Sequence, residues 1–128
     1  MDQASVLVVD DDVAALASAR AVLSAAGYAV SDAENGRRAL QRVMDGPPDV
    51  LITDILMPEG DGIELITAVK DAHPGMHIIA ISERRFLGGL DLLNLASKLG
   101  ASAILEKPLE TEKLLATVAR LSGGVGIA

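Results

Sequence analysis

The amino-acid sequence predicts a single α/β domain in which helices cover both faces of a parallel sheet. Two observations predict it: short, nearly continuous apolar runs alternate with stretches of helical periodicity, and Gly- or Pro-containing breakers separate many of them. The chain has 128 residues, no cysteine and a formal net charge of −7. This length can bury a core unaided, and the absence of thiols excludes a disulfide framework and a thiolate zinc site.

Five apolar runs are expected to form the strands of the sheet. The first is β-branched and ends in three aspartates, as is typical of a central parallel strand buried on both faces. The second is more polar, which predicts a weaker strand. The expected strands cover residues 6–9, 28–33, 50–53, 78–81 and 103–106.

A helix is expected after each strand. The first is alanine-rich, with Asp12 placed to cap its start and Gly27 to end it. Asn35 and Gly36 open the second, and a breaker-rich loop at residues 57–62 precedes the third. The first expected helix covers residues 13–26. The second runs from residue 36 to the Gly-Pro-Pro stop at 46–48, and the third from the 57–62 loop to the stop at 73–75. The fourth covers residues 90–99, after a loop containing Gly88 and Gly89, and the last covers about 110–121.

This succession of βα units matches a flavodoxin-like, doubly wound (βα)5 fold with strand order 2-1-3-4-5. In such a sheet the functional crevice lies at the carboxyl ends of the strands. We assign residues 1–121 to the domain. Residues 122–128 carry no charge and few groups that could pack, so we expect a short flexible C-terminal tail there.

Four of the expected strands end in side chains that can do chemistry. Asp10 and Asp11 follow the first strand, Asp54 the third, Ser82 the fourth and Lys107 the fifth. All lie at one edge of a parallel sheet, where three carboxylates repel one another unless they bind a cation or share a proton. Oxygen-only ligands suit Mg²⁺. The cluster therefore predicts a magnesium site.

The cation and hydroxyl at the same edge extend this prediction to a phosphoryl group. Lys107 and Ser82 would bind phosphoryl oxygens, and the carboxylate of Asp54 would be the nucleophile that carries the group. Taken singly, each residue has a plainer interpretation, as a helix cap, a solvated carboxylate, a strand-end hydroxyl or a surface lysine. Their combination favours the site.

At these residues the sequence resembles the receiver domain of two-component response regulators, and the resemblance covers essentially the whole chain. The motifs that carry it, in order, are Val8-Val9-Asp10-Asp11-Asp12, Thr53-Asp54-Ile55-Leu56-Met57-Pro58, Asp61-Gly62, Ile81-Ser82 and Lys107-Pro108.

The resemblance implies roles for these residues. Asp54 would accept a phosphoryl group from a phosphohistidine of a sensor histidine kinase or a histidine phosphotransfer protein. Asp10 and Asp11 would hold Mg²⁺ directly or through water, joined by Asp54 and the backbone carbonyl of Leu56. Ser82 and Lys107 would contact the phosphoryl oxygens. The family's cis peptide is expected at Lys107-Pro108.

The sequence departs from the family pattern at two positions and in one segment. Ile104 stands where receivers usually carry an aromatic residue, and Glu83 where the residue is normally small. Arg84 and Arg85 follow and would supply a compensating positive field. The segment between Ser82 and Lys107 is longer than in the commonest receivers, and we expect it to be the variable output surface.

We therefore expect a stand-alone phosphoacceptor switch of a phosphorelay, not an enzyme, that is cytoplasmic and signals by contact with an output protein. It would be a monomer or a phosphorylation-linked dimer. The net charge argues against a nucleic-acid partner, and no apolar run is long enough for a membrane span. The alternative is a pseudo-receiver, an interaction module that works without phosphorylation. An aspartate-nucleophile phosphatase is disfavoured because Leu56 stands where such enzymes have a second aspartate. Flavin binding is also disfavoured, because the first βα loop is acidic where a flavin phosphate would bind.

Overall fold

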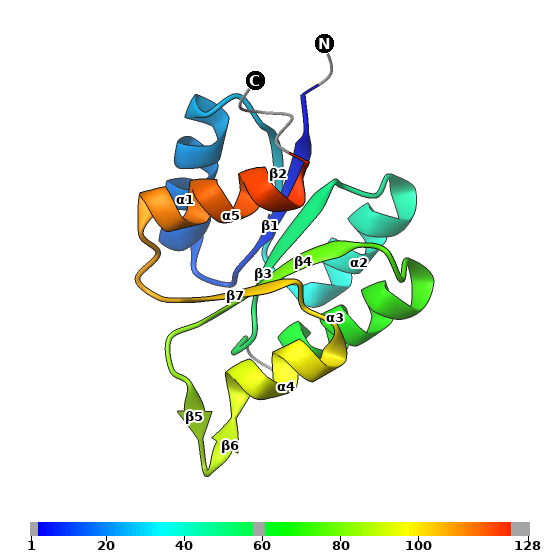
Figure 1. Ribbon diagram of the computed structural model, residues 1–128. Coiled ribbons are helices and arrows are strands. Elements are labelled where there is room, and N and C mark those ends of the chain that lie inside the picture. The colour runs from blue at the N-terminus through cyan, green and yellow to red at the C-terminus, as the bar shows by residue number, and fades with distance from the viewer. Residues whose placement is uncertain (1–2, 58–60, 124–128) are drawn as a thin grey trace.

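The computed structural model describes residues 3–57 and 61–123, and its five main strands form one parallel sheet. The order across the sheet is β2-β1-β3-β4-β7, which confirms the predicted flavodoxin-like order with β7 as the fifth strand (Figure 1). Each strand agrees with its predicted range to within one residue at either end. The strands are β1 (Ser5–Val9), β2 (Ala29–Ala33), β3 (Val50–Asp54), β4 (His77–Ser82) and β7 (Ala103–Glu106).

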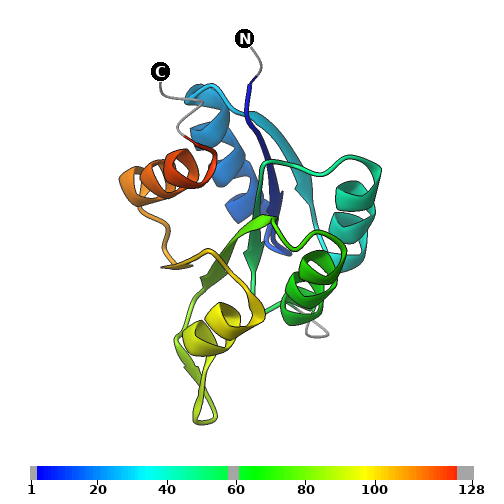
Figure 2. The same cartoon turned by 45° about the vertical axis from the view of Figure 1, so that its right-hand side comes forward.

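Helices cover both faces of the sheet, as the doubly wound fold requires. The helices α1 (Val13–Ala25) and α5 (Thr111–Leu121) lie together on one face (Figures 1 and 2). The helices α2 (Gly36–Asp45), α3 (Asp61–Ala72) and α4 (Leu92–Leu99) lie on the other. The predicted caps are confirmed: the side chain of Asp12 accepts hydrogen bonds from the first turn of α1, and that of Asn35 caps α2.

Two apolar cores follow from the alternation of side chains along the buried strands. In β1, Val6 and Val8 pack toward α1 and α5, whereas Leu7 and Val9 pack toward α2, α3 and α4. The strands β3 and β4 alternate in the same way. Because both faces are covered, these strands are continuous apolar runs. The polar residues that end them are therefore confined to the edge of the sheet.

The segment after β4 differs from the prediction. The expected loop is a β-hairpin of β5 (Phe86–Leu87) and β6 (Leu90–Asp91), so the helix expected from Leu90 begins instead at Leu92. Gly88 and Gly89, at φ of 54° and 84°, form the two-residue turn of this hairpin. The side chain of Asp91 accepts from the amide of Asn94 and caps α4, which sets the later start.

Other expectations concern the chain ends and the proline loop. The Lys107-Pro108 peptide is cis, as the resemblance implies. Residues 124–128 of the expected tail and residues 58–60 of the expected breaker-rich loop lie outside the described residues. Over residues 3–57 and 61–123, every helix is too short or too polar to span a membrane.

Candidate functional site

A cavity of about 390 Å³ opens at the carboxyl edge of the sheet, where β1, β3 and β7 end beside the segment that follows β4. Most of its wall is charged, and the residues come from loops far apart in the sequence. They are Asp10, Asp11, Asp12, Asp54, Leu56, Glu83, Arg84, Leu87 and Lys107. The fold thus brings together most of the side chains that the sequence placed at strand ends.

Three carboxylates in this cavity form a compact group. Oxygens of Asp10, Asp11 and Asp54 lie within 4.8 Å of one another. Asp10 and Asp54 are buried, with 4% and 3% of the whole residue's surface exposed, whereas Asp11 is exposed. Three oxygen ligands with one side open to water suit Mg²⁺, which keeps several waters when proteins bind it. The donor set therefore fits the ion that the sequence predicts.

Lys107 joins the two buried carboxylates. Its Nζ donates to Asp10 Oδ2 at 2.8 Å and to Asp54 Oδ2 at 2.9 Å. The backbone amide of Lys107 donates to the carbonyl oxygen of Ser82 at 2.9 Å, which fixes the start of the loop after β7 against the end of β4. The ammonium group thus neutralises one of the two negative charges that the fold buries here.

Backbone amides orient the other oxygen of each buried carboxylate. The amide of Asp12 donates to Asp10 Oδ1 at 2.9 Å, and the amide of Leu56 donates to Asp54 Oδ1 at 3.0 Å. Each carboxylate is therefore held at both oxygens, one by the loop that follows it and one by Lys107. Leu56, whose backbone carbonyl the resemblance implies as a metal ligand, lines the cavity as well.

Burial and pairing shift the ionisation of this group. Burial raises the pKa of Asp54 above its ordinary value, and the hydrogen bond from Lys107 opposes this rise without cancelling it. Burial would lower the pKa of Lys107, but its hydrogen bonds to Asp10 and Asp54 outweigh that effect and raise the pKa overall. Lys107 is therefore a permanent cation at physiological pH.

Ser82 is placed differently from the other predicted site residues. It is fully buried, and it does not line the cavity that holds the carboxylates. Its hydroxyl donates to the carbonyl oxygen of Arg84 at 2.6 Å and accepts from the amide of Arg84 at 3.3 Å. The hydroxyl thus closes a turn at the end of β4 in this conformation.

The segment after Ser82 supplies three further wall residues. Glu83, Arg84 and Leu87 line the cavity, and all three are exposed to solvent. The sequence drew attention to Glu83 and to the positive charge of Arg84, but Leu87 carried no signal. Leu87 belongs to the first strand of the hairpin, where it pairs with Leu90.

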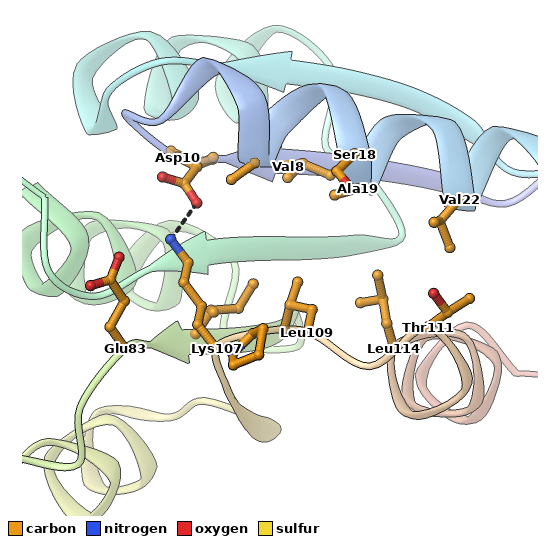
Figure 3. A pocket seen from close by; sticks show the side chains of 14 residues that line it. Val8, Asp10, Ser18, Ala19, Val22, Glu83, Lys107, Leu109, Thr111 and Leu114 are labelled. Atoms are coloured by element: carbon orange, nitrogen blue, oxygen red, sulfur yellow. Dashed lines mark hydrogen bonds and ion pairs between the residues drawn. The ribbon is translucent and has the colours of Figure 1, made fainter.

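A second cavity, of about 540 Å³, adjoins the site between α1 and α5 (Figure 3). Ala15, Ser18 and Ala19 form its wall on α1, and Leu109 and Leu114 face them from the segment before α5 and from α5 itself. The small side chains of α1 leave this space open. Asp10, Glu83 and Lys107 line one end of it, so the apolar groove leads directly to the charged cavity (Figure 3).

Comparison with known proteins gives a consistent family. The model of the response regulator receiver domain matches residues 6–119. The chain is 35% identical over 117 residues to the transcriptional regulatory protein ZraR of Klebsiella oxytoca, covering 91% of this chain and 26% of that protein. It is 35% identical over 120 residues to the response regulator MprA of Mycolicibacterium vanbaalenii, covering 91% of this chain and 49% of that protein. The chain thus spans half or less of the length of these relatives.

The fold agrees with the same family. A response regulator receiver domain protein from Clostridium thermocellum superposes with a TM-score of 0.86 at 29% identity, covering 94% of each chain. Receiver domains are signalling modules of two-component systems. On the match over residues 6–119, the fold and the acidic cavity at its carboxyl edge, this chain belongs to the response regulator receiver domain family.

Proposed function

We propose that this domain is a phosphoacceptor switch in which Asp54 takes a phosphoryl group from a phosphohistidine of a histidine kinase or a histidine phosphotransfer protein. The observation that supports it best is the grouping of Asp10, Asp11 and Asp54 with Lys107 in one cavity. A surface carboxylate without these neighbours would have no means of neutralising a phosphoryl group.

In the proposed step an oxygen of the Asp54 carboxylate attacks phosphorus. A phosphorus–oxygen bond forms as the phosphorus–nitrogen bond of the donor breaks, and the electron pair of that bond returns to the imidazole nitrogen. Lys107 lies 2.9 Å from the Asp54 carboxylate, so its charge favours the anion that attacks and stays beside the group after transfer.

We expect Mg²⁺ to be held by the side chains of Asp10, Asp11 and Asp54 and by the backbone carbonyl of Leu56. When bound, the ion supplies positive charge that offsets the phosphoryl oxygens. The exposed position of Asp11 leaves that side of the group open to water, as a hydrated ion requires. We propose Ser82 as a phosphoryl ligand only after its hydroxyl leaves the carbonyl of Arg84.

The test is intact mass after incubation with Mg²⁺ and a phosphohistidine donor or acetyl phosphate. The wild type should gain one phosphoryl group that hydroxylamine removes, and Asp54→Asn should gain none. Asp32→Asn is the matched control, because Asp32 pairs with Arg20 outside the cavity and its loss should leave labelling unchanged. Equal labelling of wild type and Asp54→Asn would assign the acceptor elsewhere.

Phosphorylation would act by shifting an equilibrium between conformations, with output by contact with a partner protein in the cytoplasm rather than by an enzymatic reaction. The segment after Ser82, α4, β7 and α5 would present the altered surface. Whether the switch is a monomer or dimerises on phosphorylation is checked by sedimentation with and without the phosphoryl group.

The second candidate is a pseudo-receiver that binds its partner without phosphorylation. Two observations favour it: the carboxylate of Glu83 stands at the cavity, and Ile104, half-buried on β7, replaces the usual aromatic residue. An unlabelled wild type, under conditions that label a control receiver, would support this candidate. Labelling of the wild type together with an effect of Ile104→Tyr on phosphoryl lifetime would contradict it.

A further inference from the structure

Arg84 is a cation at the cavity that no carboxylate in the described part of the chain engages. Its residue lines the cavity together with Asp10, Asp54 and Lys107. Among residues 3–57 and 61–123, no hydrogen bond or ion pair involves its guanidinium group. The neighbouring Arg85 differs, because it pairs with Asp91 at 3.3 Å and lies over the ring of Phe86.

The two donors that the sequence predicts for phosphoryl oxygens, Lys107 and Ser82, are already occupied. The ammonium group of Lys107 donates to both buried carboxylates, and the hydroxyl of Ser82 donates to a backbone carbonyl. A phosphoryl group on Asp54 would bring three acceptor oxygens into this space. Arg84 is the remaining charged donor in the described wall, and a planar guanidinium can bond two oxygens of one phosphoryl group at once.

The charge of the wall also favours a second cation. The wall has five carboxylates and two positive side chains, those of Lys107 and Arg84. The carboxylates belong to Asp10, Asp11, Asp12, Asp54 and Glu83. An incoming phosphodonor is itself anionic, so it meets net negative charge at the mouth of the cavity. Attraction by an exposed guanidinium group would offset this repulsion.

The backbone holds Arg84 at this position independently of its side chain. The amide and carbonyl of Arg84 both bond the hydroxyl of Ser82, and the carbonyl of Arg85 accepts from the amide of Leu92 at 2.7 Å. The segment is therefore tied to the end of β4 on one side and to the start of α4 on the other. The side chain of Arg84 remains available to a ligand.

We propose that the guanidinium group of Arg84 binds phosphoryl oxygens at Asp54 and so acts as a further specificity-determining residue for phosphoryl transfer. The inference rests on the proposed function. It adds a charged contact from Arg84 to the contact proposed for Ser82, and it gives the segment after β4 a direct part in the chemistry.

The experiment compares wild type, Arg84→Gln, Arg84→Lys and Arg85→Gln in the presence of Mg²⁺. Two quantities are measured: the affinity for beryllofluoride, a tetrahedral stand-in for the phosphoryl group, and the initial rate of labelling by acetyl phosphate. Loss of a charge-assisted bond should lower both by about tenfold in Arg84→Gln, with Arg84→Lys intermediate. Arg85→Gln should stay within about twofold of wild type, because its side chain points to Asp91 and Phe86.

Three other results would overturn the inference. Equal affinity and rate in Arg84→Gln and wild type would show that the guanidinium makes no contact. Equal losses in Arg84→Gln and Arg85→Gln would indicate a structural effect of the segment. A wild type that binds no beryllofluoride and takes no label would contradict the proposed function together with this inference. The first two results would overturn the inference and leave the proposed function standing.

Discussion

At the residue scale, the ion pairs of Lys107 set the electrostatics of the site. One ammonium group serves two carboxylates, and all three side chains are largely buried, with 14%, 5% and 4% of their surfaces exposed for Lys107, Asp10 and Asp54. Buried ion pairs add little net stability compared with apolar packing, but breaking one leaves an uncompensated charge. Lys107 is therefore expected to contribute to stability as well as to the proposed chemistry.

We expect Lys107→Met to lower the free energy of unfolding by about 3 kcal/mol at pH 7 without divalent metal, because two buried carboxylates lose their cation. Urea denaturation in EDTA measures it. Lys113→Met is the control: its pair with Glu110, at 3.7 Å, is exposed to solvent, so the change should be under about 0.5 kcal/mol. Equal effects of the two substitutions would contradict the account.

Asp54 makes stability depend on pH. Its pKa is raised in the folded protein, so the folded state holds the proton more tightly than the unfolded chain. The free energy of unfolding therefore falls as pH rises from the ordinary value of 3.8 through the raised pKa, and the loss is complete above that pKa.

Asp54→Asn removes this loss, while Lys107 keeps Asp10 as its partner. In EDTA at pH 7 the variant should be more stable than wild type by about 1 kcal/mol, and the difference should shrink as pH is lowered toward about 4. Chemical denaturation across this pH range checks it. A difference that grows at low pH would reverse the sign of the argument.

At the scale of elements, the contact between α3 and the end of β3 positions Asp54, the proposed acceptor. Gly62, buried in the first turn of α3, lies directly against the backbone of Asp54 and Ile55. A Cβ at this position would overlap the carbonyl oxygens of both residues. The glycine is therefore needed for close approach, since an added methyl group has no space.

Gly62→Ala should lower the free energy of unfolding by about 2 kcal/mol or displace the end of β3 that carries Asp54, since backbone atoms must move to admit the methyl group. Thermal unfolding measures the first effect and the labelling rate the second. The control is Gly75→Ala, where nothing lies within 4 Å of the added Cβ. If the two alanine variants unfold at the same temperature, the close approach has no energetic consequence.

The hairpin of β5 and β6 is the element that local patterning described least well. Its two strands have two residues each, and Phe86, Leu87 and Leu90 are exposed, so no apolar period marks them. The helix expected from Leu90 fails there because Asp91 caps α4 and pairs with Arg85, contacts that form only once the segment turns back. The hairpin bears on the proposed site because its residue Leu87 lines the cavity.

At the scale of the whole molecule, we expect the net charge of −7 and the acidic edge to make folding responsive to divalent metal. A ligand that binds only the folded state stabilises it in proportion to the logarithm of its concentration. Mg²⁺ should therefore raise the melting temperature, with about 1.4 kcal/mol gained for each tenfold rise above the dissociation constant. Differential scanning calorimetry over a magnesium series measures it.

Asp11→Asn is the matched variant for this prediction. Asp11 belongs to the carboxylate group but makes no bond to Lys107, so its loss should weaken the response to Mg²⁺ while leaving the metal-free protein folded. Glu34→Gln, at an exposed carboxylate outside the group, should respond as wild type. An identical magnesium response in all three proteins would exclude the proposed metal site.

Local patterning was sufficient to predict the five strands of the main sheet, their parallel order and the edge at which Asp10, Asp11, Asp54 and Lys107 meet. The reason is that buried parallel strands must be continuously apolar, so their polar ends mark the edge of the sheet along the chain. Packing between distant segments set the bridge of Lys107 between two carboxylates. The turn closed by Ser82 holds Arg84 at the cavity, and the hairpin that follows carries Leu87 there. These contacts depend on loops whose conformations are fixed by neighbours far away in sequence, and no residue period encodes them.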